Sequence, residues 1–254
     1  MLESGRFVLI ESPACPWCHR VSTVAALRGL DTLLPRLNVH WLLGEDGWEL
    51  TPEAGERLAA PGEPPMRWLR ELYLASDPEV SGTVTVPVLW DQKTRKIINN
   101  ESEDLIRMLD AVTNGSRDDE PPLFPPDAQA EILEVNERIY HEVNDGVYRC
   151  GFAQTQAAYD EAVERLFNAL DWLEDRLSTR QWLVGPHRTE ADWRLFPTLI
   201  RFEYIYRGHF RCSRRSLMEY PALWAYTRAL FQVCLLYTSP SPRDTERSRM
   251  PSSA

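Results

Sequence analysis

The chain has 254 residues, of which 43% are hydrophobic, and a formal net charge of −10. This length allows one large or two ordinary globular domains, and the negative charge argues against a nucleic-acid or anionic-membrane surface. No apolar stretch approaches the ~20 residues of a membrane span, so we expect no membrane insertion. Five cysteines do not suit a secreted disulfide framework, which favours the cytoplasm.

The chain opens with an apolar run that leads into a cysteine-containing turn. Residues 7–10 predict a buried strand, and the segment from Pro16 to Gly29 has the spacing and the end signal of a helix. Cys15 lies between them. At a helix start, unpaired backbone N–H groups and the positive end of the helix dipole favour thiolate over thiol. Cys15 is therefore a candidate nucleophile.

Two other interpretations of Cys15 and Cys18 compete with thiol chemistry. A Cys-x-x-Cys pair can be half of a zinc site, but closing one requires two more ligands, and Cys150 and Cys212 stand alone in the sequence. Both cysteines can also be inert core residues. The Pro-Trp spacer at a strand-to-helix turn favours thiol chemistry, and we expect no metal.

The rest of the first half alternates between strand and helix signals. We expect elements at 38–43 (strand), 51–65 (loop), 68 to about 76 (helix), 83–90 (strand), 96–98 (strand) and 101–112 (helix). Pro87 interrupts its strand pattern and so belongs at a sheet edge or in a cis peptide. The order strand, helix, strand, helix, strand, strand, helix is typical of a thioredoxin-like domain.

Composition and periodicity divide the chain further. We expect a thioredoxin-like domain at 1–112, a linker at 113–127, an all-helical domain at 128–233 and a disordered tail at 234–254. Thr189, followed by Asp192 three residues later, forms a capping-box pattern that opens a nearly apolar helix ending near Tyr206. The tail resembles a translated sequencing adapter rather than a natural terminus, and we assign it no function.

A set of motifs in a fixed order gives the chain a specific resemblance. Over roughly residues 6–233 it resembles the Xi class of glutathione transferases, the glutathionyl-hydroquinone reductases. The matching stretches are Ala14–Trp17 with His19 and Arg20, Gly44–Trp48, Val84–Asp91, Asn99–Ser102, Asn144–Tyr148 and Arg194–Phe202. The resemblance implies an α/β thioredoxin-like N-terminal domain followed by an all-α glutathione-transferase C-terminal domain.

The resemblance assigns five residues to glutathione. Val86, ahead of a cis Pro87, would pair its backbone with the cysteinyl unit as an added strand does. Glu101 and Ser102, at a helix start, would hold the γ-glutamyl end, and Trp48 would pack against the tripeptide. On their own, Glu101 and Ser102 would more often be helix caps and Trp48 a core residue.

The resemblance also implies the reaction. Cys15 would take glutathione from a glutathionyl-hydroquinone, giving a mixed disulfide that a second glutathione resolves, with hydroquinone and glutathione disulfide as products. Tyr148 and Tyr206 would contact the hydroxyl groups of an aromatic substrate held between the domains. Without the resemblance, both tyrosines would be ordinary core or interface residues. The implied partners are glutathione and glutathionylated aromatic quinols.

Departures from the family pattern leave alternatives open. Cys18 replaces the usual alanine. One alternative is therefore a dithiol, glutaredoxin-like oxidoreductase, in which Cys15 is the nucleophile and Cys18 is the resolving thiol. Thr83 stands where the family usually has a basic residue. The loss of that cation would weaken the binding of a glutathione carboxylate, unless Arg67 or Arg95 substitutes for it. A non-catalytic interaction module with this fold is the other alternative. The family continues past residue 233 with a segment that helps form a homodimer, and this chain departs from it there, so the choice between homodimer and monomer stays open.

Overall fold

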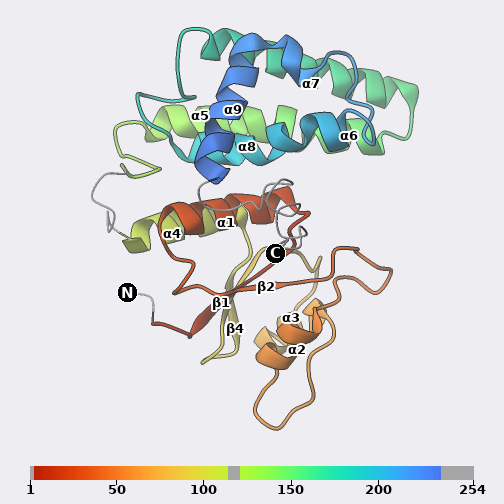
Figure 1. Ribbon diagram of the computed structural model, residues 1–254. Helices are drawn as coiled ribbons and strands as arrows, with labels where there is room; N and C mark the ends of the chain where they lie inside the picture. Colours follow the sequence, from red (N-terminus) through yellow and green to blue (C-terminus); the bar gives the residue numbers. More distant parts are fainter. Residues whose placement is uncertain (1–2, 114–120, 236–254) are drawn as a thin grey trace, which may run out of the picture. The chain divides into compact units, whose positions relative to one another are not determined.

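The computed structural model describes residues 3–113 and 121–235. These residues fall into two compact units, one up to Pro122 and the other from Leu123 onward. The first unit is α/β and the second is all-α (Figure 1), as the fold class predicts. The predicted disordered tail begins at residue 234, but residues 234 and 235 still belong to the last helix of the second unit, which their apolar neighbours continue. The rest of that prediction, residues 236–254, lies outside the described residues.

A four-stranded mixed sheet forms the centre of the first unit. Its strands are β1 (Phe7–Glu11), β2 (Arg36–Asn38), β3 (Val88–Asp91) and β4 (Lys96–Asn99), in the order β2-β1-β3-β4. β1 runs parallel to β2 and antiparallel to β3, and β4 is antiparallel to β3. Every residue of β3 is buried, as is all of β1 after its first residue. β1 and β3 are therefore the rigid frame on which the following turns are mounted.

Helices cover both faces of this sheet (Figure 1): α1 (Pro16–Leu27) and α4 (Ser102–Thr113) on one, α2 (Pro52–Leu58) and α3 (Leu69–Ser76) on the other. The end of α1 is joined to α4 by the Arg28 guanidinium, whose Nε donates to Asp110 Oδ1 over 2.7 Å. Both side chains are nearly buried. A buried pair of this kind fixes which residues of the two helices meet.

The second strand is shorter and earlier than the predicted 38–43. β1 ends at Glu11, whose partner in the register is Asn38, so the chain beyond Val39 has no strand to continue pairing with. The apolar side chains that suggested a strand are instead exposed: Trp41 by 72%, Leu42 by 55% and Leu43 by 54%.

Two further boundaries also differ from the prediction, both at prolines. The predicted loop 51–65 contains α2, because Pro52 occupies the first helical turn, where a missing N–H costs nothing, and Thr51 caps it by accepting from Ala54 N. The predicted strand 83–90 begins only at Val88 and extends to Asp91, because Pro87 has no N–H to give to the sheet.

The second unit is built from helices that pack on one another (Figure 1). They are α5 (Gln129–Ile139), η1 (Tyr140–Asn144), α6 (Gly146–Phe152), α7 (Gln156–Leu177), α8 (Glu190–Arg201), η2 (Phe202–Tyr206), η3 (Leu217–Glu219) and α9 (Pro221–Leu235). The predicted apolar helix ending at Tyr206 is α8 followed by one π-helical turn, η2. It is buried from Glu190 to Leu199.

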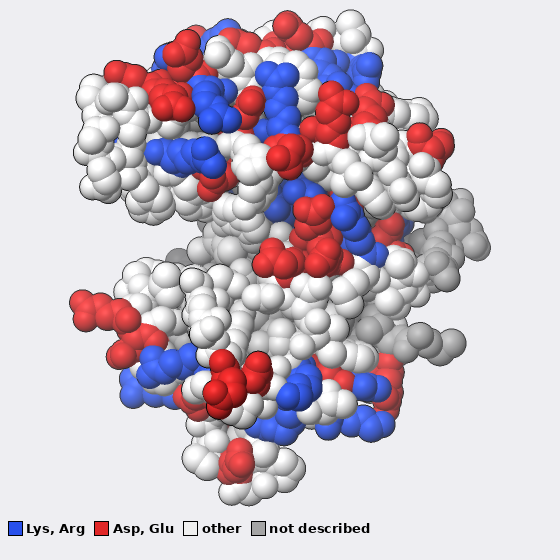
Figure 2. Space-filling view, turned by 180° about the vertical axis from the view of Figure 1, so that it is seen from behind, with Lys and Arg blue, Asp and Glu red and all other residues white. Residues whose placement is uncertain are grey.

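Charges are mixed on the molecular surface. On the face shown in Figure 2, the acidic and basic side chains of the described residues lie interspersed rather than in one continuous stripe. None of the helices in the described ranges is both long and apolar enough to cross a membrane.

The predicted capping box at the start of α8 is present and reaches well beyond the helix. Asp192 is fully buried, and its carboxylate accepts from Thr189 N at 2.7 Å, from Leu183 N at 3.0 Å and from the Tyr226 hydroxyl at 2.8 Å. One side chain therefore joins α8 to the preceding loop and to α9.

Replacing Asp192 should strongly destabilise the fold. Asp192→Ala removes the acceptor of four buried donors, two N–H groups and the Thr189 and Tyr226 hydroxyls. Each unsatisfied donor costs about 1–3 kcal/mol, so we expect the free energy of unfolding to fall by at least about 3 kcal/mol in urea titrations. Asp160→Ala, which removes an exposed hydrogen bond to Gln156 on α7, is the matched control and should change it by less than about 0.5 kcal/mol. Equal effects of the two substitutions would contradict this role of Asp192.

Candidate active site

Cys15 is the N-cap residue of α1, directly after the turn that follows β1. Its backbone is extended, with φ −77° and ψ 123°, Pro16 occupies the first helical position, and the Cys15 side chain makes no capping hydrogen bond. The thiol instead points at the Val86 carbonyl oxygen, 3.9 Å from the sulfur. The N–H groups of the first turn of α1 stabilise negative charge at this position.

A cavity of about 300 Å³ opens at Cys15. The residues that line it are Cys15, Trp17, Trp48, Thr85, Val86, Pro87, Asn100, Glu101 and Ser102. The structure thus brings together the predicted nucleophile and all five residues predicted to hold glutathione, although they are spread over nearly ninety positions of sequence. Sequence analysis had assigned no role to Thr85 or Asn100.

Thr85 and Asn100 belong to a small polar network that shapes one wall of the cavity. The Tyr73 hydroxyl donates to the Thr85 carbonyl at 2.8 Å and accepts from Asn100 Nδ2 at 3.1 Å. Asn100 also donates to the Thr85 hydroxyl at 3.3 Å. A buried tyrosine hydroxyl needs hydrogen-bond partners. That need was the one sequence signal that could have pointed to Thr85 and Asn100. The network holds in place the segment that leads into the cis Val86–Pro87 peptide.

The start of α4 contributes the acidic end of the cavity. Glu101 is exposed, and its backbone N–H donates to Asn99 Oδ1 at 2.7 Å. Ser102 is buried, and its hydroxyl accepts from Arg20 Nη1 at 3.3 Å. The Arg20 guanidinium also lies over the Trp17 ring at 5.4 Å. A buried cation of α1 thus adjoins the helix start that carries Glu101.

The basic side chains considered as substitutes at Thr83 do not line this cavity. Arg67 pairs with Glu49, with 3.0 Å between Nε and Oε1, and Arg95 donates to the Leu58 carbonyl at 3.2 Å. Both guanidinium groups therefore serve contacts elsewhere in the first unit.

Cys18 differs from Cys15 in exposure and in acidity. It is 1% exposed, and its sulfur accepts from the Ser12 N–H at 3.4 Å. Burial, together with a hydrogen bond to the Cys15 thiol, raises the pKa of Cys18 well above its usual range. A buried thiol that resists ionisation is a poor attacking group. Within the described residues, no cluster of three or more side chains could ligate a metal.

Glu11, the last residue of β1, is a buried acid close to this site. Burial raises the pKa of Glu11 to about 7, against the opposing influence of Arg36, and the Cys15 thiol adds to the rise. The Arg36 guanidinium is 4.0 Å from Glu11 Oε1, while Oε2 is buried without a hydrogen-bond partner in the described part of the chain. Glu11 therefore favours its neutral form inside the fold.

Tyr148 and Tyr206 meet in the second unit. Their hydroxyl oxygens are 3.4 Å apart and their ring centroids 5.8 Å apart. Phe210 stacks on Tyr206 at 5.3 Å, and this close packing requires Gly151, since a Cβ there would lie 1.9 Å from the Phe210 ring. Phe152, which is 65% exposed, completes the aromatic cluster. Sequence analysis missed both phenylalanines because their contact joins distant segments.

The raised pKa of Glu11 predicts a pH-dependent loss of stability. Below pH 4.5 the carboxyl is neutral in both folded and unfolded chains; as pH rises towards 7 only the unfolded chain ionises freely, so the folded state loses up to roughly 3 kcal/mol. We therefore expect Glu11→Gln to match the wild type near pH 4.5 and to be more stable at pH 8, in denaturant titrations at both pH values. Glu63→Gln, at an exposed turn, should show no such difference, and a Glu11→Gln variant that is no more stable at pH 8 would refute the assignment.

The chain is similar to known proteins over most of its length. Family models for the N-terminal and C-terminal domains of glutathione S-transferase match residues 14–112 and 156–229. The chain is 45% identical over 225 residues to the glutathionyl-hydroquinone reductase PcpF of Sphingobium chlorophenolicum, covering 87% of this chain and 70% of that protein.

Solved structures are similar over the same region. The glutathione-bound structure of YqjG, a glutathione transferase homologue from Escherichia coli K-12, has a TM-score of 0.83 at 39% identity and covers 91% of this chain and 75% of its own. An Xi-class glutathione transferase from Natrialba magadii has a TM-score of 0.82 at 40% identity, with coverage of 91% and 71%.

Proposed function

The chain belongs to the Xi class of the glutathione transferase family, and from this premise we propose that it is a glutathionyl-hydroquinone reductase whose nucleophile is Cys15. The observation that carries the proposal is the cavity at the start of α1, in which the Cys15 thiol shares one space with Val86, Glu101 and Ser102. A nucleophilic sulfur therefore lies among groups that suit the backbone and the charged end of a tripeptide.

Glutathione would bind along the cavity wall. The backbone of Val86, which lines the cavity, pairs with the cysteinyl unit as a peptide does when it is added to a sheet edge. The Glu101 carboxylate accepts from the γ-glutamyl ammonium, and the Ser102 N–H, at the start of α4, meets the neighbouring carboxylate. Trp48, which also lines the cavity, packs against the tripeptide.

The reaction follows from thiol–disulfide chemistry. The Cys15 thiolate attacks the glutathionyl sulfur, the sulfur–carbon bond to the ring breaks, and the ring carbon takes the electron pair and a proton. Tyr148 and Tyr206 donate their phenolic protons in hydrogen bonds to the quinol oxygens. A second glutathione thiolate then attacks the mixed disulfide, releasing Cys15 and glutathione disulfide. Because this cycle consumes reduced glutathione, we place it in the cytoplasm.

A dithiol cycle that uses Cys18 is the competing mechanism. Cys18 lies three residues after Cys15, within the first turn of α1, which is the spacing that a dithiol motif uses for internal resolution. The burial of Cys18 and its raised pKa work against it. External glutathione is therefore the better resolving thiol.

Single substitutions distinguish the two mechanisms. In turnover of a glutathionyl-hydroquinone with glutathione, we expect Cys15→Ser to lose at least about a thousandfold in kcat, because the attacking sulfur is gone. Cys18→Ala should stay within about threefold of the wild type. A Cys18→Ala variant as inactive as Cys15→Ser would establish the dithiol cycle, and an active Cys15→Ser variant would exclude Cys15 as the nucleophile.

The role of Glu101 is tested by its binding of glutathione. Glu101→Gln removes the charge that pairs with the γ-glutamyl ammonium, worth about 1.4 kcal/mol or more, so we expect the Kd measured by calorimetry to rise at least about tenfold. Glu103→Gln is the matched control: it removes the same charge two residues away, in the first turn of α4, but Glu103 does not line the cavity. The Kd of Glu103→Gln should stay within about twofold of the wild type. Equal effects of both variants would show that Glu101 acts only through the overall charge and makes no specific contact with glutathione.

A further inference from the structure

Arg20 is a buried cation that joins two walls of the candidate active site. It lies on α1, more than one helical turn after Cys15, and is 3% exposed. Arg20 Nη1 donates to the Ser102 hydroxyl oxygen at 3.3 Å, and the guanidinium carbon lies 5.4 Å from the centre of the Trp17 ring. Trp17 and Ser102 both line the cavity at Cys15, and Arg20 lies behind that lining. Arg20 therefore acts on the cavity through the two side chains that it contacts.

The hydrogen bond from Arg20 determines what the Ser102 hydroxyl offers to a ligand. A serine hydroxyl has one hydrogen to donate and two lone pairs that accept. Because the Ser102 oxygen accepts from Arg20, the hydroxyl hydrogen points away from the guanidinium and remains for another acceptor. A bond from a cation also polarises the hydroxyl and strengthens the hydrogen bond that it donates. The acceptor that suits this hydroxyl best is an anion such as a carboxylate.

The charges at this end of the cavity match those of a zwitterion. Glu101 is exposed and lines the cavity, so its carboxylate suits a ligand cation. The next residue, Ser102, begins α4 and is backed by the Arg20 guanidinium, so it suits a ligand anion. A group for a cation and a group for an anion thus come from adjacent residues. The ammonium and carboxylate on the α-carbon of a free amino-acid group are adjacent in the same way.

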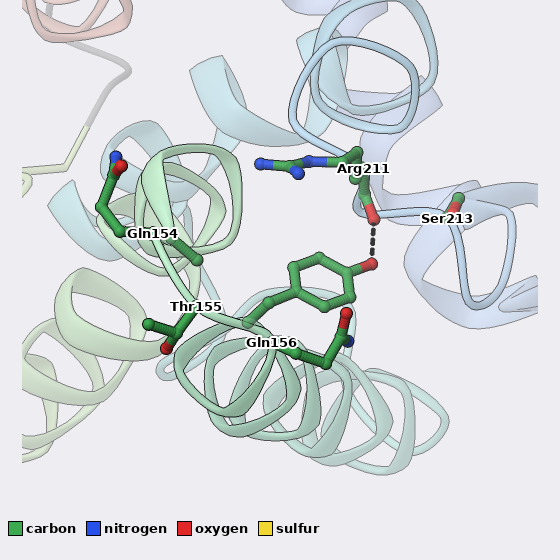
Figure 3. Close-up of a pocket in the computed structure, with 7 residues that line it drawn as sticks. Gln154, Thr155, Gln156, Arg211 and Ser213 are labelled. Atoms are coloured by element: carbon green, nitrogen blue, oxygen red, sulfur yellow. Dashed lines mark hydrogen bonds between the residues drawn. The ribbon is translucent and has the colours of Figure 1, made fainter.

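A cavity of the second unit serves as a comparison. It has a volume of about 440 Å³ and is surrounded by polar side chains, among them Arg211 (Figure 3). The Arg211 guanidinium lies over the Tyr159 ring at 5.7 Å and donates to the Gly151 carbonyl at 2.9 Å. The described residues that line this cavity include no acid, so it offers a cation without a neighbouring carboxylate. Of these two cavities, the one at Cys15 is the one that matches both charges of a zwitterion.

We propose that Arg20 is a positioning residue that makes the site selective for thiols with a free γ-glutamyl group. It does so by orienting the Ser102 hydroxyl towards the α-carboxylate of that group, while Glu101 pairs with the ammonium. The same guanidinium holds the Trp17 ring in the cavity wall beside the thiol. This inference rests on the part of the proposed function that places glutathione at Cys15, and not on the reductase chemistry.

The test is calorimetric titration of the full chain, under reducing conditions, with three ligands. They are glutathione, an analogue in which the α-carboxylate of the γ-glutamyl unit is amidated, and an analogue in which the glycyl carboxylate is amidated. The two analogues lose the same charge at opposite ends. We expect α-amidation to raise the Kd of the wild type at least about tenfold, but that of Arg20→Gln less than about threefold. The effect of glycyl amidation should be the same in both proteins.

Three further variants separate positioning from general support of the fold. Arg28→Lys is the matched control, because Arg28 is also a buried arginine bonded to α4, through Asp110, which does not line the cavity. Its α-amidation effect should equal that of the wild type. Arg20→Lys keeps the charge without the planar fork that reaches two partners, so its effect should be intermediate. Ser102→Ala leaves Arg20 in place and should reduce the α-amidation effect as Arg20→Gln does, which makes the test independent of the folding of one variant.

Two results would overturn the proposal. One is an α-amidation effect as large in Arg20→Gln and Ser102→Ala as in the wild type. The other is an equal reduction of that effect in Arg28→Lys, which would leave Arg20 as a structural support of α1. A wild type that shows the expected selectivity but does not turn over a glutathionyl-hydroquinone would support the role of Arg20 and exclude the proposed reductase function.

Discussion

The pairing of β1 with β3 is the constraint on which the candidate active site depends. Ile10 lies opposite Val88 in this ladder, so the chain leaving β1 and the chain entering β3 start from neighbouring points of the same buried sheet. The turn after β1 ends at Cys15, and the turn before β3 contains Val86; their meeting, thiol to carbonyl, follows from the register. Shifting β3 by one residue in this register would turn its side chains to the opposite face of the sheet and separate the two groups.

The two cysteines of the Cys-x-x-Cys motif differ because one stands outside the helix and the other inside it. Cys15 is the N-cap, with an extended backbone that turns its sulfur towards the cavity. Cys18 is on the first turn of α1, on the face that packs into the hydrophobic core. Burial keeps the Cys18 sulfur as a neutral thiol, so Cys15 is the cysteine of the pair that is able to react.

Sequence patterns correctly predicted the elements that depend on interactions between neighbouring residues. The helix after Pro16, the capping box at Asp192 and the hairpin of β3 and β4 were all predictable, because each depends on neighbouring residues. The exposure of Trp41 was not predictable, because its segment has the pattern of a strand but no neighbouring strand to pair with. The contact of the Cys212 thiol with the Val147 carbonyl could not be predicted either, because it depends on how α6 packs against a segment more than sixty residues away. Motifs that match a known family did locate the cavity residues, because they carry such long-range information implicitly.

The meeting of the two tyrosines rests on paired irregularities in the helices that carry them. η1 precedes Tyr148 and η2 ends at Tyr206, and each is a single π-helical turn, a feature that adds one residue to a turn and is frequent at functional sites. Asn144, the last residue of η1, donates from Nδ2 to the buried Thr198 hydroxyl at 2.8 Å. A buried polar group that loses its hydrogen bond is costly, so this contact favours the alignment of the two helices in which the phenolic hydroxyls lie 3.4 Å apart.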